Sequence, residues 1–112
     1  MKAILVNPFL RTITEVEMTD NYQEIYTQLS TDEITVGCFT TGWRCANDDI
    51  LYVDDEGLFK KGWPLFDVGR GDGSLLAGKG LIQGDDGEGG AADVKSTVAE
   101  ITELVRWTDW VT

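Results

Sequence analysis

Residues 1–18 read MKAILVNPFLRTITEVEM, and this stretch decides the fold. Residues 3–6 form a continuous apolar run, which is typical of a strand buried on both faces. Asn7-Pro8 then favours a turn, because proline fixes φ and donates no backbone hydrogen bond. From 11 to 18 apolar and polar residues alternate, but Ile13 and Val16 are three positions apart, which would fit a bulge. We therefore expect residues 1–18 to form a β-hairpin.

Two later segments have the spacing of amphipathic helices. In residues 22–29 apolar side chains recur at i, i+3, i+4 and i+7, after the capping signal Asp20-Asn21. Residues 98–105 show a similar stripe, and Thr97 with Glu100 matches a capping box. Both stripes are typical of helices that pack against a core.

Short apolar or alternating runs predict the remaining strands. They are residues 34–41, 50–53, the end of 58–68, 80–83 and 105–111. The last of these is expected to return to the sheet, although a longer second helix with a frayed end is an alternative. We expect residues 41–49 to form a connection and residues 54–57 an acidic turn.

The 112 residues have the length of one domain. We expect a single acidic α+β domain over residues 1–112, with a small, mostly antiparallel sheet and two short helices. Glycine-rich stretches at about 69–74 and 84–92 predict mobile loops, because glycine loses much backbone entropy when it is ordered.

Charge is the strongest functional signal. Twenty acidic residues stand against nine basic ones, the formal net charge is −11, and histidine is absent. Such a surface repels nucleic acid and anionic membranes and attracts basic surfaces. The lack of histidine removes the commonest general base and metal ligand. The sequence therefore predicts a basic protein or nucleoprotein complex as partner, with no direct nucleic acid, membrane, metal or cofactor.

Catalytic motifs are missing as well. No histidine could activate a serine or a cysteine, and neither glycine-rich stretch has the P-loop pattern. Residues 85–88 lack the ligand spacing of a calcium loop. Two carboxylates acting as acid and base remain an alternative, but we expect a protein that is not an enzyme. Cys38 and Cys45 are expected to be free thiols, with a bridge across a tight turn as the alternative.

Several motifs resemble a known family. Residues 52–58 (YVDDEGL) and 76–84 (LAGKGLIQG), together with 2–8 (KAILVNP) and 24–26 (EIY), are similar to a domain-of-unknown-function family of small phage, prophage and plasmid proteins. The resemblance implies a mobile-element origin and no established activity. Residues 37–47 and the tryptophan-rich tail depart from it. No apolar run is long enough for a signal peptide or a membrane span, so we expect a protein of the bacterial host cytoplasm.

Acidic turns and two tryptophans are the candidate partner-binding residues: Asp48, Asp49, Asp54, Asp55, Glu56, Asp85, Asp86, Glu88, Trp43 and Trp110. Carboxylates on a rigid domain can take the place of phosphates against lysine and arginine. The sequence thus predicts a phage-encoded inhibitor of a host defence system, of the anti-CRISPR or anti-restriction type. The alternative is an accessory or regulatory module whose acidity serves only solubility. Exposed tryptophans would also be compatible with a homodimer.

Overall fold

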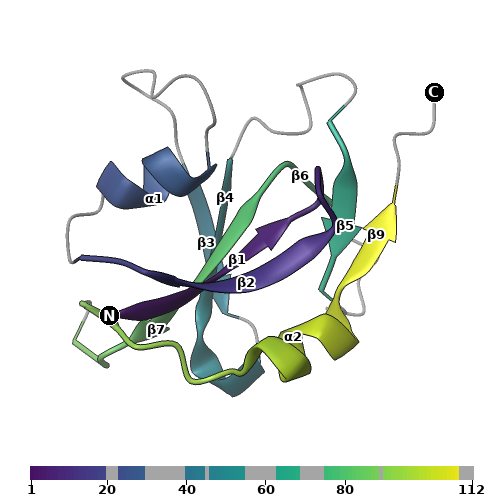
Figure 1. The fold of residues 1–112 in the computed structure, drawn as a ribbon. Coiled ribbons are helices and arrows are strands. Elements are labelled where there is room, and N and C mark those ends of the chain that lie inside the picture. Colours follow the sequence, from purple (N-terminus) through teal and green to yellow (C-terminus); the bar gives the residue numbers. More distant parts are fainter. Residues whose placement is uncertain are drawn as a thin grey trace.

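The structure is a computed structural model of the chain, and it describes residues 1–19, 23–29, 40–44, 46–54, 63–68, 75–88 and 90–108. Within these residues two antiparallel sheets and two helices form an α+β fold, which confirms the predicted class (Figure 1).

The central sheet has the strand order β2-β1-β7-β4-β3, and a short strand, β8, pairs with β7. Its strands are β1 (Lys2–Asn7), β2 (Thr12–Glu17), β3 (Thr40–Arg44), β4 (Ile50–Asp54), β7 (Gly80–Asp85) and β8 (Ala91–Ala92). The smaller sheet has the order β6-β5-β9. It consists of β5 (Leu65–Asp67), β6 (Leu76–Ala77) and β9 (Arg106–Thr108). The two helices are α1 (Gln23–Leu29) and α2 (Val98–Leu104), and a short 3-10 turn, η1 (Ala46–Asp48), precedes β4.

The N-terminal hairpin is confirmed, and its register explains the imperfect alternation of its second strand. Pairing runs without interruption from Lys2 opposite Glu17 to Asn7 opposite Thr12, so the ladder holds no bulge. Successive side chains point to opposite faces of a strand. Ile13 therefore lies on one face and packs against the larger core cluster, whereas Val16 lies on the other and packs against the smaller cluster.

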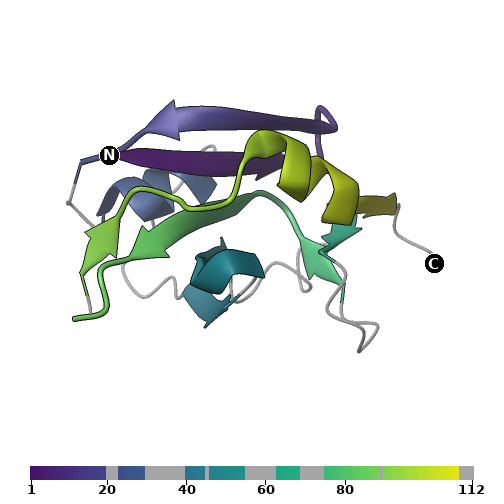
Figure 2. The same cartoon turned by 90° about the horizontal axis from the view of Figure 1, so that it is seen from below.

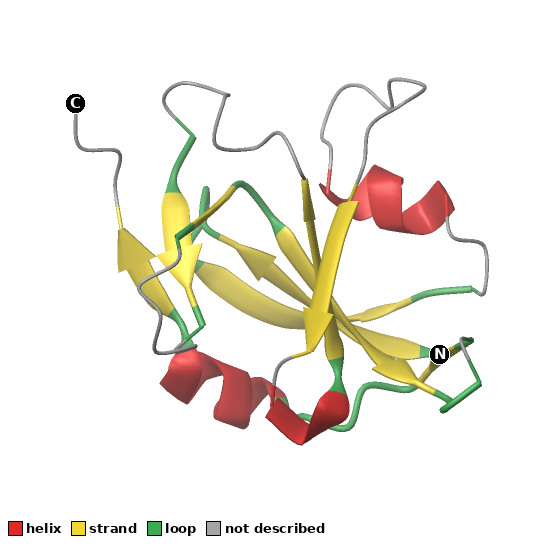
Figure 3. Cartoon of the chain, turned by 180° about the vertical axis from the view of Figure 1, so that it is seen from behind, coloured by secondary structure: helices red, strands yellow, loops and turns green. Residues whose placement is uncertain are grey.

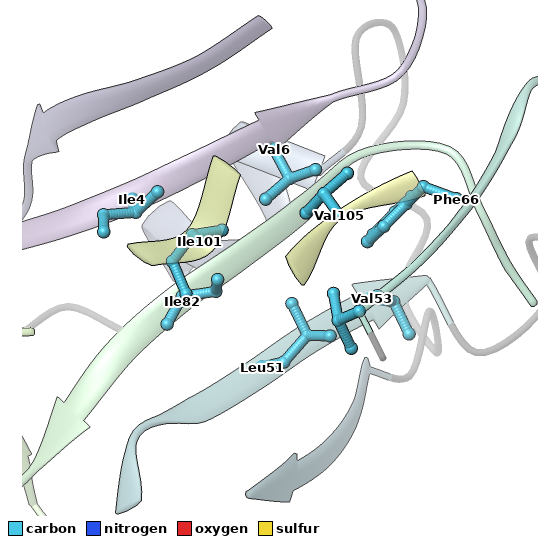
Figure 4. Close-up of a cluster of buried hydrophobic side chains, with 9 residues drawn as sticks. Ile4, Val6, Leu51, Val53, Phe66, Ile82, Ile101 and Val105 are labelled. Carbon is cyan, nitrogen blue, oxygen red and sulfur yellow. The ribbon is translucent and has the colours of Figure 1, made fainter. Parts of the chain in front are cut away.

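The larger core lies between the central sheet and α2 together with β5 and β9. Figure 4 shows Ile4, Val6 and Ile82 from the central sheet facing Ile101 and Val105 at α2. Phe66, from β5, is fully buried in the same cluster and tilts against Trp107 of β9 at a centroid distance of 6.5 Å. Burying this apolar surface is the main stabilising contribution to such a fold.

The opposite face of the central sheet is covered by α1. Leu29 packs with Ala3, Met18 and Leu81, and Ile25 lies beside them. Figure 3 shows α1 well apart from α2, with η1 beside α2. The sheet therefore carries one helix on each face, and the described side chains of the predicted stripes, Ile25 and Leu29 in α1 and Val98, Ile101 and Leu104 in α2, lie on the sides that pack.

Several predictions change at the level of single elements. Residues 42–44 were expected in a connection but belong to β3, while residues 34–39 of the predicted strand lie outside the described residues. β7 extends to Asp85, beyond the predicted strand, and the two-residue strands β6 and β8 were not predicted. The predicted tail strand is present as β9, but it joins the smaller sheet. Cys38 and Cys45 lie outside the described residues.

Candidate acidic interface

Strand register gathers acidic residues from separate turns at one end of the central sheet. Ile50 pairs with Gln83 in the antiparallel β4–β7 ladder, so the residues just before β4 and those at the end of β7 lie at the same end. Ile4 pairs with Ile82, which places the start of β1 there as well. Glu17, at the end of β2, pairs with Lys2. We call this region the acidic end, and it comprises Glu15, Glu17, Asp48, Asp85, Asp86, Glu88 and Asp93.

Most carboxylates of the acidic end are exposed, and the two on β2 each have a cation nearby. Lys2 approaches Glu15 at 3.7 Å, and the N-terminal ammonium approaches Glu17 at 3.6 Å. The Glu15 and Glu17 side chains keep 53% and 77% of their surface exposed. Exposed ion pairs of this kind contribute little free energy and exchange readily with other partners. The region therefore keeps an excess of negative charge that another molecule can reach.

Backbone hydrogen bonds within the β7–β8 turn hold the Asp85 and Asp86 carboxylates. One Asp86 carboxylate oxygen accepts hydrogen bonds from the Glu88 and Gly90 N–H groups at 2.7 and 2.9 Å. Asp85 accepts the N–H of Gly87 at 3.0 Å. The glycine-rich stretch was predicted to be a loose loop, but in its described part these side-chain bonds close a short hairpin (Figure 1). Asp86 and Glu88 are exposed, and Asp85 is half-buried.

Asp49 was predicted to bind a partner, and this prediction is wrong. Its side chain is fully buried. One carboxylate oxygen accepts the Lys95 N–H at 2.9 Å, and the other accepts the Ser96 N–H at 2.8 Å. The residue therefore connects the start of β4 to the segment before α2, and no partner can reach it.

Asn47 extends this connection to the first turn of α2. Its amide donates to the Ser96 hydroxyl at 3.2 Å and to the Glu100 carboxylate at 3.0 Å. Glu100 also accepts the Thr97 N–H, which completes the predicted capping box. The hydrogen bond from Asn47, followed by those from Thr97, lowers the pKa of Glu100 below 4.5. Asn47 has a φ of 61°, a left-handed conformation that asparagine tolerates better than most residues.

Of the remaining predicted residues, Asp54 does not join the acidic end. Asp54 is the last residue of β4, so its backbone lies at the opposite end of the strand from Asp48. Asp55, Glu56 and Trp110 lie outside the described residues. The backbone of Trp43 lies in β3 opposite Leu51, and its role in binding stays a prediction.

Sequence reasoning missed Glu15, Glu17 and Asp93. Glu15 and Glu17 share one face of β2, and their spacing in the hairpin sequence was the available signal. Asp93 gave no such signal. It lies at the acidic end because one of its carboxylate oxygens accepts the Lys2 N–H at 2.8 Å, across 91 positions of sequence.

The ionisable groups of the acidic end are mainly exposed carboxylates. Burial raises the pKa of the nearby Tyr52, and the negative charge of Asp85 raises it further, because both disfavour the phenolate. Among the described residues no group of three or more histidine, cysteine, aspartate or glutamate side chains could hold a metal ion. None of the described helices is long and apolar enough to cross a membrane.

Large apolar side chains are exposed in the β1–β2 turn, away from the acidic end, and beside β6. Phe9 and Leu10, in the β1–β2 turn, are 45% and 71% exposed, and Leu75 is 37% exposed. Phe9 meets Trp63 edge-on at a centroid distance of 5.6 Å. The Asn7 side chain shapes the turn by accepting the N–H groups of Phe9 and Leu10.

No family model matches the chain, and neither a curated protein nor a solved structure matches it significantly. The resemblance to small phage and plasmid proteins therefore stays a prediction from the sequence motifs.

Proposed function

We propose that this chain is a protein-binding inhibitor whose acidic end occupies a basic, nucleic-acid-binding surface of another protein. The register of β2, β1, β7 and β4 is the observation that carries the proposal, because it gathers exposed carboxylates from three separate turns or strands. The formal net charge of −11 adds long-range attraction to a basic target.

The arrangement of the acidic end favours a role in partner binding over a role in solubility alone. Charges that serve only solubility need no fixed arrangement, whereas the Asp86 carboxylate is held by two backbone hydrogen bonds. A carboxylate held in this way loses little entropy on binding, and this favours affinity. The motif resemblance to mobile-element proteins makes a host defence nuclease, of CRISPR or restriction type, the target class that we propose.

Cleavage assays test this function directly. Purified CRISPR effector complexes and restriction nucleases are assayed for DNA binding and cleavage with and without the chain, at low and high salt. We expect at least one to be inhibited, and inhibition to weaken with salt. If all of them remain active and the chain captures no basic protein at low salt, the proposal is wrong.

A matched pair of variants locates the interface. Glu17→Gln combined with Glu88→Gln removes two exposed charges of the acidic end, and Glu103→Gln removes one exposed charge from the last turn of α2. Inhibition should fall in the first variant and persist in the second. Unchanged inhibition in both, with an intact fold, would instead favour an accessory module that is acidic only for solubility.

A further inference from the structure

No described strand pairs with the outer edge of β2. β2 is the end strand of the central sheet, and Figure 2 shows no described element beyond it. Met1 and Met18 exchange both backbone hydrogen bonds, at 2.7 and 2.8 Å. In an antiparallel ladder hydrogen-bonded pairs alternate with non-bonded ones. The Thr12, Thr14 and Val16 backbones therefore face β1, and those of Ile13, Glu15 and Glu17 face outward.

An independent observation agrees with this assignment. If Glu17 is a non-bonded partner of Lys2, the Lys2 backbone must point away from β2. Its N–H indeed donates to Asp93, and its carbonyl accepts the Val94 N–H at 2.9 Å. Within the described residues, the outward N–H and C=O groups of Ile13, Glu15 and Glu17 make no hydrogen bond. An extended segment laid along β2 could form backbone hydrogen bonds with all three residues.

The negative charge along β2 determines which kind of partner segment can bind its edge. The Glu15 and Glu17 side chains lie on the same face of β2 as Ile13, two residues apart. In an added strand, the residues opposite them would project on that face with Cβ atoms about 5 Å away. Opposite charges in such cross-strand pairs are favourable, so lysine or arginine at alternate positions would complement the two carboxylates. Lys2 and the N-terminal ammonium already approach them, but only through exposed contacts.

Self-pairing through the same edge is disfavoured. In the symmetric antiparallel register that uses all three outward residues, Glu15 would face Glu15 of a second copy. Like charges directly opposite each other destabilise a sheet, and each copy also carries a net charge of −11. Charged edge residues are a common protection against such association.

We propose that the edge of β2 binds an extended basic segment of a partner protein by strand addition, with Glu15 and Glu17 selecting lysine or arginine at alternate positions. This inference rests on the proposed function in taking the partner to be basic, and it adds the mode of binding. The Ile13, Glu15 and Glu17 backbones supply the hydrogen bonds, while the two carboxylates supply the selectivity.

The test uses a synthetic peptide in which lysine alternates with threonine. Binding is followed by calorimetry and by amide hydrogen exchange of the ¹⁵N-labelled chain. We expect the amides of Ile13, Glu15 and Glu17 to become protected, while those of Thr12, Thr14 and Val16 stay protected throughout. The same peptide with N-methylated backbone amides should bind weakly, because it can donate few backbone hydrogen bonds.

Two substitutions at one position separate charge from backbone. Glu15→Gln removes the carboxylate and should weaken binding about threefold, whereas Glu15→Pro also removes an outward N–H and should weaken it roughly tenfold. Proline is tolerated there because that N–H makes no bond to β1. Glu103→Gln is the control and should bind the peptide as the wild type does. If Glu15→Pro unfolds the protein, the exchange pattern of the wild type decides the outcome.

Unaltered exchange at Ile13, Glu15 and Glu17 with bound peptide, or full binding by folded Glu15→Pro, would overturn the inference. A concentration-dependent dimer that protects the same amides without peptide would also overturn it. The proposed function fails separately. If the chain binds the peptide at β2 but inhibits no nuclease, the strand-addition proposal stands and the proposed function is wrong. If inhibition survives Glu15→Pro, the proposed function stands and the strand-addition proposal is wrong.

Discussion

Asp49 and Ser96 are 47 positions apart, yet the buried carboxylate of Asp49 accepts the Ser96 N–H at 2.8 Å. Together with the parallel bond from Lys95, this contact fixes the segment before α2 against the start of β4.

Asp49→Asn should destabilise the fold by about 1–3 kcal/mol, because an amide offers one acceptor oxygen and turns its NH₂ group toward a buried N–H donor. The adjacent Asp48→Asn is the matched control. Asp48 is exposed and has a φ of 61°, which asparagine adopts readily, so its effect should stay within about 0.5 kcal/mol. Urea denaturation of both variants measures the difference, and equal stabilities would contradict the role of Asp49.

Glu100 should contribute stability that depends on pH. Its pKa is lowered by the hydrogen bonds from Asn47 and Thr97, so the folded state favours the carboxylate. A group with a lowered folded pKa stabilises the protein above its unfolded pKa, and the contribution is lost as pH falls through the folded value. The stability difference between wild type and Glu100→Gln should therefore be present at neutral pH and shrink below pH 4.5.

Asn47→Gly isolates the largest cause of that shift, because glycine keeps the left-handed backbone and removes the amide. The Glu100 pKa, followed by NMR titration, should rise toward 4.5 in this variant. Glu24 serves as an internal reference, since its pKa is lowered by hydrogen bonds from Thr19 instead. A shift in both carboxyl groups would indicate a general loss of structure.

Tyr52 should titrate above 10 in an alkaline absorbance titration. Asp85→Asn should lower the Tyr52 pKa without returning it to 10, because burial is the larger cause and remains. Since folding holds this proton more tightly, stability should fall as pH rises past the unfolded pKa of Tyr52. Glu88→Gln, in the same turn, should leave the phenol titration unchanged. An equal effect of both variants would argue against a specific Asp85 contribution.

Among the described glycines of the β7–β8 hairpin, Gly84 should be the least replaceable. An added Cβ would overlap the backbone carbonyl oxygen of Asp93, which cannot move without disturbing β8. Gly84→Ala should cost roughly 2 kcal/mol or more. In Gly87→Ala no atom lies within 4 Å of the new Cβ, and only the φ of +84° opposes it, at a cost of about 1 kcal/mol. Thermal melts of the two variants provide the comparison.

Local patterns were enough to predict the hairpin, both helices and the α+β class, because each of these elements shows its period in its own residues. These local patterns do not predict the register between distant strands. No local signal indicates that Asp85 lies at the same end of the sheet as Asp48, or that β9 joins the smaller sheet, because both depend on pairing between distant segments.

Local patterns also do not predict which of two adjacent aspartates is buried. Asp48 and Asp49 are identical and adjacent in sequence, yet one is exposed and the other is fully buried. Asp49 can be buried because two backbone N–H groups, from residues nearly fifty positions away, donate to its carboxylate. The candidate site was therefore predictable in its chemistry but not in its membership.

The pairing of β1 with β7 has a consequence for how the chain reaches its native state. Ile4 pairs with Ile82, and Lys2 bonds to Asp93 and Val94, so β1 can meet these partners only after the ribosome has added nearly eighty further residues or more. Contacts so distant in sequence slow folding. Until then the hairpin exposes Ile4 and Val6 to the cell, and this interval is when the protein is most vulnerable to aggregation and proteolysis.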